Sequence, residues 1–211
     1  MKSIRKIWYR ARFAVTALAN DGRGVAAIEF AMLLPIMLML FFGTVIFSSA
    51  IAVDRKVTLM AQTFSNLVSQ NYAVTAVQLQ NFFNADNAIM TPYDSTLTSA
   101  IITELYIDPT TLVPKVEWSL PYNGPNVVTP VSAHATGVAL TPNTVPAALA
   151  VPGTYLIYSE ISYLFTPPVA GTMGFMRNGV NLKDVAYTRP RQSTCVIYPT
   201  PTSGALPNCP Q

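Results

Sequence analysis

The chain has 211 residues, of which 51% are hydrophobic and only 11% are charged, and its formal net charge is +3. Soluble domains average about 25% charged residues, so this composition disfavours an ordinary soluble protein. The length allows one folded domain together with an anchor. With one histidine and two cysteines in the whole chain, we expect no metal site and no cofactor.

Basic residues concentrate in the first 24 residues, which we interpret as a cytoplasmic leader. A basic flank before a membrane span marks the cytoplasmic side of the membrane. Because the rest of the chain is not basic, the flank does not indicate nucleic-acid binding. Asp21 is the only acid there, and the basic residues are Lys2, Arg5, Lys6, Arg10, Arg12 and Arg23.

The segment from Phe30 to Val53 contains no charged residue. As a helix it would be roughly 36 Å long at ~1.5 Å per residue, enough to cross a hydrocarbon core of about 30 Å. We therefore predict a transmembrane helix over residues 25–53, with Pro35 inside it. A buried helix of a soluble protein is the alternative. Residues 54–211 then form a domain on the far side of the membrane, in the periplasm or outside the cell.

Helical periodicity continues beyond the predicted span and predicts one helix from about Val25 to about Gln70. Its second half carries apolar residues at three- and four-residue spacing, which should pack on the outer domain. Thr75 and Gln78 form a capping pattern that predicts a second helix over 76–90, ending before Pro92. The spaced apolar residues in the second half of the first helix are Val57, Met60, Phe64, Leu67 and Val68.

After the second predicted helix the pattern changes to a period of two, which is typical of antiparallel strands. We predict strands over residues 99–107, 115–120, 155–165 and 182–188. The stretch between Trp118 and Ser159 has six prolines and no Asp, Glu, Lys or Arg, which favours loops and short edge strands. The expected fold class is therefore α+β, with a long N-terminal transmembrane helix that extends into a domain whose second helix packs on an antiparallel sheet.

Aromatic residues are frequent in the predicted strands and allow two interpretations. They could form a platform for carbohydrate, but their alternation within strands favours packing in the core. These residues are Trp118, Tyr155, Tyr158, Tyr163 and Phe165. The single histidine, His134, lies in an uncharged stretch and is predicted to be a surface-loop residue.

Both cysteines, Cys195 and Cys209, lie near the C-terminus. If that end lies outside the cytoplasm, a disulfide is the expected state, and two free thiols are the alternative. The bond would close a loop of about 15 residues and contribute about 3 kcal/mol in the chain-entropy model.

The most informative residues for function lie where the span begins. Gly24 is followed directly by Val25. Glu29 lies five positions after Gly24, and Phe30 comes next. This is the layout of a type IV prepilin signal, in which cleavage after the glycine removes the basic leader. Cleavage would expose an α-ammonium on Val25, one helical turn from the Glu29 carboxylate and near the positive end of the helix dipole. The alternative is an uncleaved anchor in which Glu29 lies in the headgroup region.

Three segments resemble the TadE/TadG-like family. Residues 24–35 (GVAAIEFAMLLP) resemble its opening, residues 157–167 (IYSEISYLFTP) resemble its Glu-aliphatic-Ser-Tyr strand, and residues 186–191 (AYTRPR) resemble its closing Arg-Pro-Arg strand end. The larger TadG branch carries a von Willebrand A-type domain with an Asp-x-Ser-x-Ser motif. That motif does not occur here, so the smaller branch fits better.

The resemblance implies a minor pilin or pseudopilin of a tight-adherence (Flp-type) pilus, held in the bacterial inner membrane with its N-terminus in the cytoplasm. Gly24 maps to the cleavage position and Glu29 to the family's glutamate. The implied partners are a prepilin peptidase, other pilin or pseudopilin subunits and the secretion platform. An uncleaved single-pass structural or adhesion protein is the alternative. No motif for catalysis occurs, so an enzyme is not expected.

Overall fold

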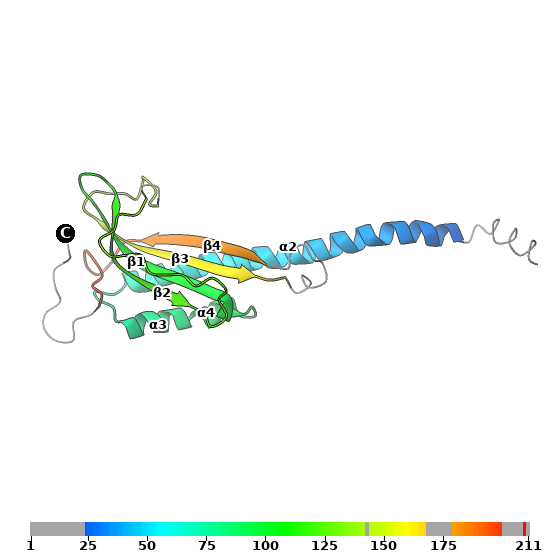
Figure 1. The fold of residues 1–211 in the computed structure, drawn as a ribbon, viewed down its shortest axis with the longest axis horizontal. Coiled ribbons are helices and arrows are strands. Elements are labelled where there is room, and N and C mark those ends of the chain that lie inside the picture. The colour runs from blue at the N-terminus through cyan, green and yellow to red at the C-terminus, as the bar shows by residue number, and fades with distance from the viewer. Residues whose placement is uncertain (1–23, 142–143, 168–178, 200–208, 210–211) are drawn as a thin grey trace, which may run out of the picture. The chain divides into compact units, whose positions relative to one another are not determined.

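The computed structural model describes residues 24–141, 144–167, 179–199 and 209, and they form one long helix, two short helices and a sheet (Figure 1). The long helix, α2, runs over Val25–Ser69 with Pro35 inside it. The chain divides into two compact units, Met1–Phe47 and Ser48–Gln211. The boundary falls within α2 and within the span predicted over residues 25–53, so where a bilayer would end stays a prediction.

The part of α2 that belongs to the second unit is amphipathic. One stripe of its side chains is completely buried, at the three- and four-residue spacing of a helix face. Leu67, which we predicted to belong to this stripe, is only half-buried. The stripe consists of Val53, Val57, Met60, Ala61, Phe64 and Val68. The predicted continuation of one helix into the following domain is therefore confirmed, whereas the place of this domain outside the membrane stays a prediction.

The second predicted helix, over residues 76–90, is wrong in one respect because the structure breaks it into α3 (Ala76–Asn84) and α4 (Asp86–Met90). The predicted cap at the start is present: Gln78 N–H donates to Thr75 Oγ1 (3.1 Å), and Thr75 N–H donates to Gln78 Oε1 (2.9 Å). The break lies at Ala85, whose N–H donates to the Phe82 carbonyl three residues back (3.1 Å). Such a bond tightens the last turn and ends α3 there.

Four antiparallel strands form one sheet in the order β2-β1-β3-β4. A 3₁₀ turn, η2 (Ser95–Leu97), leads into the first strand. Pro121 lies inside β2, which is tolerated because β2 is an edge strand. The strands are β1 (Thr98–Ile107), β2 (Pro114–Asn123), β3 (Tyr155–Phe165) and β4 (Val180–Thr188).

Helices cover one face of the sheet. Phe64 of α2 meets Phe83 of α3 edge-on, with ring centroids 5.5 Å apart, and Phe83 stacks on Tyr122 of β2 at 4.9 Å. Ser65 of α2 donates to the Ile157 carbonyl of β3 (3.2 Å) and to Thr188 Oγ1 of β4 (2.7 Å). These contacts place the main core between the helices and the sheet.

The long segment between β2 and β3 covers part of the opposite face, where a second apolar cluster includes Leu105, Val116 and Tyr158 together with Val145. Because both faces are covered there, the first five residues of β3 are all buried instead of alternating. The five aromatic residues considered above are all buried (3–6% exposed), which confirms core packing. The predicted α+β fold class is confirmed.

Candidate processing segment and C-terminal strap

Gly24 immediately precedes the long helix, which begins at Val25. An added Cβ at Gly24 would meet no atom of the described residues within 4 Å, and the side chain of Val25 is 54% exposed. The peptide bond between Gly24 and Val25 therefore lies at the edge of a regular helix, in a segment open to another protein. This is the position at which we predicted cleavage, and cleavage itself stays a prediction.

Glu29 is the fifth residue of α2 and is exposed. In a helix, the side chain at position i+4 lies one turn from position i, so Glu29 lies about 6 Å along the axis from the backbone nitrogen of Val25. Among the described residues, no hydrogen bond or ion pair of this carboxylate is present. Its charge is therefore available to an ammonium created at Val25 or brought by another subunit.

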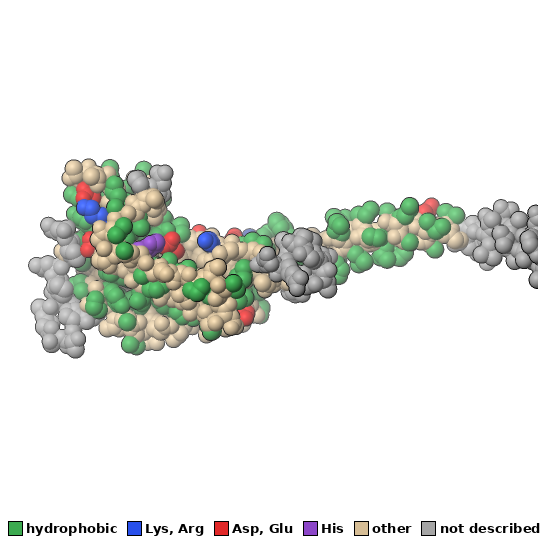
Figure 2. Space-filling model, viewed as in Figure 1, with side chains coloured by type: hydrophobic (Ala, Val, Ile, Leu, Met, Phe, Trp, Pro, Cys, Tyr) green, Lys and Arg blue, Asp and Glu red, His purple; other side chains and the backbone are tan. Residues whose placement is uncertain are grey.

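The N-terminal part of α2 exposes large apolar side chains along its length, and those on the visible face are green in Figure 2. Of its most apolar 18-residue window, 6% is buried, and α2 is the one helix in the described part of the chain that is long and apolar enough to cross a membrane. Soluble proteins do not leave such a surface in water. The length and the exposed apolar surface of α2 support the predicted membrane helix. Its orientation in the membrane stays a prediction.

The segment after β4, residues 191–198, lies against the end of α2 and the linker that follows it, and we call it the C-terminal strap. Arg191 N–H donates to the Ser69 carbonyl at the end of α2 (2.8 Å). Ile197 N–H donates to the Tyr72 carbonyl (3.1 Å) and its own carbonyl accepts from Val74 N–H (2.9 Å). The strap therefore pairs, as a short parallel bridge, with the linker between α2 and α3.

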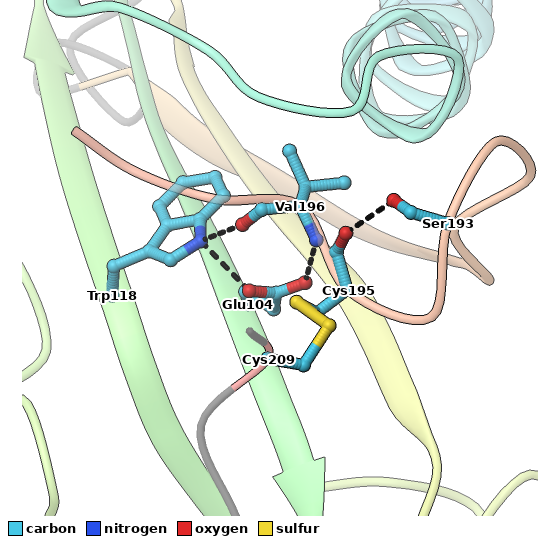
Figure 3. The surroundings of a disulfide bond; sticks show 6 residues. All are labelled: Glu104, Trp118, Ser193, Cys195, Val196 and Cys209. Carbon is cyan, nitrogen blue, oxygen red and sulfur yellow. Dashed lines mark hydrogen bonds between the residues drawn. A yellow bond between two sulfur atoms is a disulfide. The ribbon is translucent and has the colours of Figure 1, made fainter. Parts of the chain in front are cut away.

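A buried carboxylate in β1 holds the strap from the other side (Figure 3). Glu104 is 1% exposed, and its Oε1 accepts from Val196 N–H at 2.6 Å. Trp118 Nε1–H donates both to Glu104 Oε2 (2.8 Å) and to the Val196 carbonyl (2.7 Å). The three residues thus form a closed set of hydrogen bonds that links two strands to the strap.

The predicted disulfide between Cys195 and Cys209 is present in the structure, with the two Cα atoms 5.7 Å apart. Cys195 is buried and lies next to Val196, so the covalent link and the Glu104 hydrogen bond act on adjacent residues. The strap is therefore fixed by backbone pairing, by a carboxylate and by a covalent bond.

Two buried carboxyl groups of this domain have raised pKa values. Burial raises the pKa of Glu104 to about 8, against the N–H donors of Val196 and Trp118, which favour its charged form. Burial also raises the pKa of Asp86 to about 7. The Thr98 hydroxyl lowers it somewhat, but neither Asp86 oxygen nor Thr98 Oγ1 has a hydrogen bond of good geometry among the described residues. Desolvation therefore decides the direction.

These shifts predict that the protein is more stable at pH 5 than at pH 8. In the unfolded chain, both carboxyls lose their protons near pH 4, whereas in the folded chain they keep them until about pH 7 to 8. The free energy of unfolding should therefore fall as pH rises through this window and level off above it. One pKa unit corresponds to about 1.4 kcal/mol and both groups contribute, so the total fall should be on the order of several kcal/mol.

Thermal unfolding of the full-length protein in detergent between pH 5 and 9 measures this dependence. Asp86→Asn should remove the Asp86 part of the fall, and subtracting the curve of this variant from that of the wild type isolates that part. A wild-type stability that is constant or rises from pH 5 to pH 8 would contradict the assignment.

His134 lies in the loop between β2 and β3, as predicted, but its ring is only 27% exposed. Its Nε2 lies 2.5 Å from Glu160 Oε2. One histidine beside one carboxylate provides neither a nucleophile nor a set of metal ligands. Within the described residues, no group of three or more His, Cys, Asp or Glu side chains could hold a metal ion.

Sequence reasoning did not identify Glu104 or Asp86. Glu104 could have been noticed in the sequence, because it is the one acid in β1 (Thr98–Ile107). An isolated acid between buried positions needs hydrogen-bond partners. Asp86 has no such signal, because its neighbours Asn84 and Asn87 are polar and the break in the helix that buries it is not marked by glycine or proline.

In the comparisons with known proteins, one family model matches part of the chain. Residues 24–63 match the model described as TadE-like protein. The match begins at Gly24 and ends within α2, so it covers less than half of the chain. It does not reach residues 157–167 or 186–191, whose resemblance to the same family stays a prediction. No curated protein and no solved structure matches the chain.

Proposed function

We propose that this chain, whose residues 24–63 are TadE-like, is a minor pilin or pseudopilin of a tight-adherence pilus and is processed after Gly24. The observation that carries the proposal is the start of α2. A glycine and the first helical residue, Val25, are followed one turn later by a carboxylate that has no partner among the described residues, and then by an apolar helix surface. The family match begins at the same glycine.

Processing would change the chemistry of the helix end. Hydrolysis of the Gly24–Val25 peptide bond releases the basic leader and leaves an α-ammonium on Val25. The new charge lies within reach of the Glu29 carboxylate of the same helix or of a neighbouring subunit. In an apolar surrounding such a pair is strongly favoured over two separated charges, so it would orient adjacent subunits.

The proposed location is the bacterial inner membrane, with a single span, the leader in the cytoplasm and residues 54–211 in the periplasm. The Cys195–Cys209 disulfide supports an oxidising compartment for the domain. The proposed partners are a prepilin peptidase, other pilin or pseudopilin subunits and the secretion platform. We propose no catalytic role, because the sequence carries no catalytic motif.

The alternative is an uncleaved single-pass protein with a structural or adhesive outer domain. It shares the apolar helix and the disulfide and differs only in the use of Gly24. In this alternative Glu29 lies in the headgroup region and Gly24 has no particular role. We favour processing because the family match begins at Gly24.

Deletion of the gene in its own host tests the pilus role. We expect loss of surface pili and of surface adhesion, both restored by the wild-type gene. A deletion strain with unchanged pili and adhesion would contradict the proposal. Immunoblots of pilin subunits in the same cells serve as the control, because they separate failed assembly from failed synthesis.

A further inference from the structure

The outer edge of β4 differs from the other edge of the sheet. On the edge strand β2, a following loop makes backbone hydrogen bonds: Val116 N–H donates to the Val138 carbonyl (3.0 Å) and Leu140 N–H to the Pro114 carbonyl (2.9 Å). Among the described residues, β4 pairs only with β3. An open edge is a template on which another extended chain can form hydrogen bonds.

The hydrogen bonds of β4 show which backbone groups face outward. Val185 N–H donates to the Asp184 carboxylate (2.8 Å) and not to β3, so it is directed away from the sheet. Every second residue of an antiparallel strand directs its backbone groups to the same side. Lys183 and Tyr187 therefore present their N–H and carbonyl groups outward as well.

A groove of about 430 Å³ follows the second half of this edge. It touches three consecutive residues of β4, Ala186, Tyr187 and Thr188. Consecutive side chains of a strand point to opposite faces, so a groove that touches all three must run along the edge. Its other wall is α2, through Gln62, Thr63 and Asn66, and Arg191 lies at its end.

The polar groups of the groove indicate what fits in it. Asn66 Oδ1 is buried and has no hydrogen-bond donor among the described residues. This oxygen has no accessible surface, so the polar groups that the α2 wall offers to an added chain are the side chains of the exposed Gln62 and the partly exposed Thr63. The groove therefore provides hydrogen-bonding groups on both walls.

The charges at the end of the groove are positive. Arg191 lines the groove, and Arg189 directly follows the last lining residue of β4, Thr188. Both arginines are exposed, and the ion pairs in the described part of the chain are Lys115–Asp108 and His134–Glu160. Neither arginine therefore has a carboxylate partner there. The nearest acid on β4, Asp184, is engaged by Thr58 and by Val185 N–H.

We propose that the β4 edge binds an extended segment of a different polypeptide, which adds a strand beside β4 and places a carboxylate on Arg189 and Arg191. The partner is acidic by charge complementarity. It is not a second copy of this chain, because none of the ten acidic residues in the sequence is adjacent to another, so the chain has no acidic segment to offer. The proposal does not depend on a role in pili.

Peptide binding to the full-length protein in zwitterionic detergent tests the proposal. The probe is a fluorescein-labelled decapeptide with two glutamates at each end and six alternating threonine and valine residues between them. We expect saturable binding by fluorescence anisotropy. A peptide with lysines in place of the glutamates, and a peptide methylated on alternate backbone nitrogens, should both bind at least about tenfold more weakly.

Two sets of variants locate the site. The charge reversal R189E/R191E should weaken binding by roughly tenfold, and Val185→Pro should abolish it because the proline ring occupies the space of the added strand. Val185→Thr, which keeps the N–H, is the matched control and should bind like wild type. Near-ultraviolet circular dichroism checks that each variant is folded.

Three results would overturn the proposal. Equal binding of the methylated peptide would show a purely electrostatic contact, and equal binding of the lysine peptide would remove the acidic partner. Self-association of the wild type that is lost in Val185→Pro would assign the edge to a second copy.

Discussion

Replacing Glu29 by alanine is expected to abolish pilus assembly while the protein remains in the membrane. The carboxylate is exposed on α2 one turn from Val25 and has no partner among the described residues. In an assembled pilus it would pair with an ammonium group in an apolar environment, where such a pair is worth far more than in water. Losing even about 1.4 kcal/mol per contact lowers an association constant tenfold, so pili should fall by more than roughly tenfold.

Membrane insertion of the protein should not be impaired by the loss of the Glu29 charge. A charged residue in a membrane helix disfavours insertion by about 3 kcal/mol at the centre of the helix, so Glu29→Ala should insert at least as well as wild type. Glu29→Gln should also fail in assembly, because it keeps the shape and loses the charge. Asp54→Asn, which removes an exposed carboxylate farther along α2, is the matched control and should assemble normally. Wild-type numbers of pili in Glu29→Ala would refute the role of this charge.

Glu104→Ala is expected to produce the largest loss of stability in the outer domain. It removes the acceptor of the buried Val196 N–H and one of the two acceptors of the Trp118 indole, and it leaves a cavity between β1 and the strap. A buried donor left without an acceptor costs about 1–3 kcal/mol, and cavity formation adds to this. The free energy of unfolding should therefore fall by about 2–4 kcal/mol, and backbone amides of the C-terminal strap should exchange faster with solvent.

Glu117→Ala provides the control, because Glu117 is a partly exposed glutamate in β2, and it should change the free energy of unfolding by less than about 1 kcal/mol.

Cys195→Ser should lower the free energy of unfolding by about 3 kcal/mol through loss of the cross-link. Because Glu104 and the disulfide hold adjacent residues of the strap, their effects should not be additive. If Glu104→Ala were as stable as Glu117→Ala, Glu104 would have no part in holding the strap.

Much of the fold could be predicted because its signals are local. The uncharged run from Phe30 to Val53 and the apolar stripe after it predict one helix, and its end at Ser69 lies one residue from the predicted Gln70. The Thr75–Gln78 cap predicts the start of α3 correctly. The period of two predicts β2 and β3: β3 has the predicted bounds, and β2 extends beyond 115–120 at both ends. The two further candidates, 99–107 and 182–188, are strands that begin slightly earlier than expected.

The features that could not be predicted depend on contacts between distant residues. Ala85 is a good helix former, so nothing in the sequence marks the break between α3 and α4. The hydrogen bond of Glu104 to Val196 joins residues 92 positions apart. The strand order and the open edge of β4 also depend on pairing across the sheet, which periodicity alone does not determine.

Some candidate functional residues could be found from the sequence and others could not, for the same reason. Gly24 and Glu29 could be chosen from the sequence because they lie close together at the start of a helix, and the structure adds that both are open to a partner. The groove beside β4 could not be found in this way, because Asn66 and Arg191 are brought to it from α2 and from the strap.

The N-terminal sequence of the membrane-extracted protein, from cells with and without their prepilin peptidase, tests the central claim most directly. We predict a chain that begins at Val25 when the peptidase is present and a chain that keeps residues 1–24 when it is absent. A chain that keeps residues 1–24 in both cells would contradict processing and would make the protein a permanent anchor.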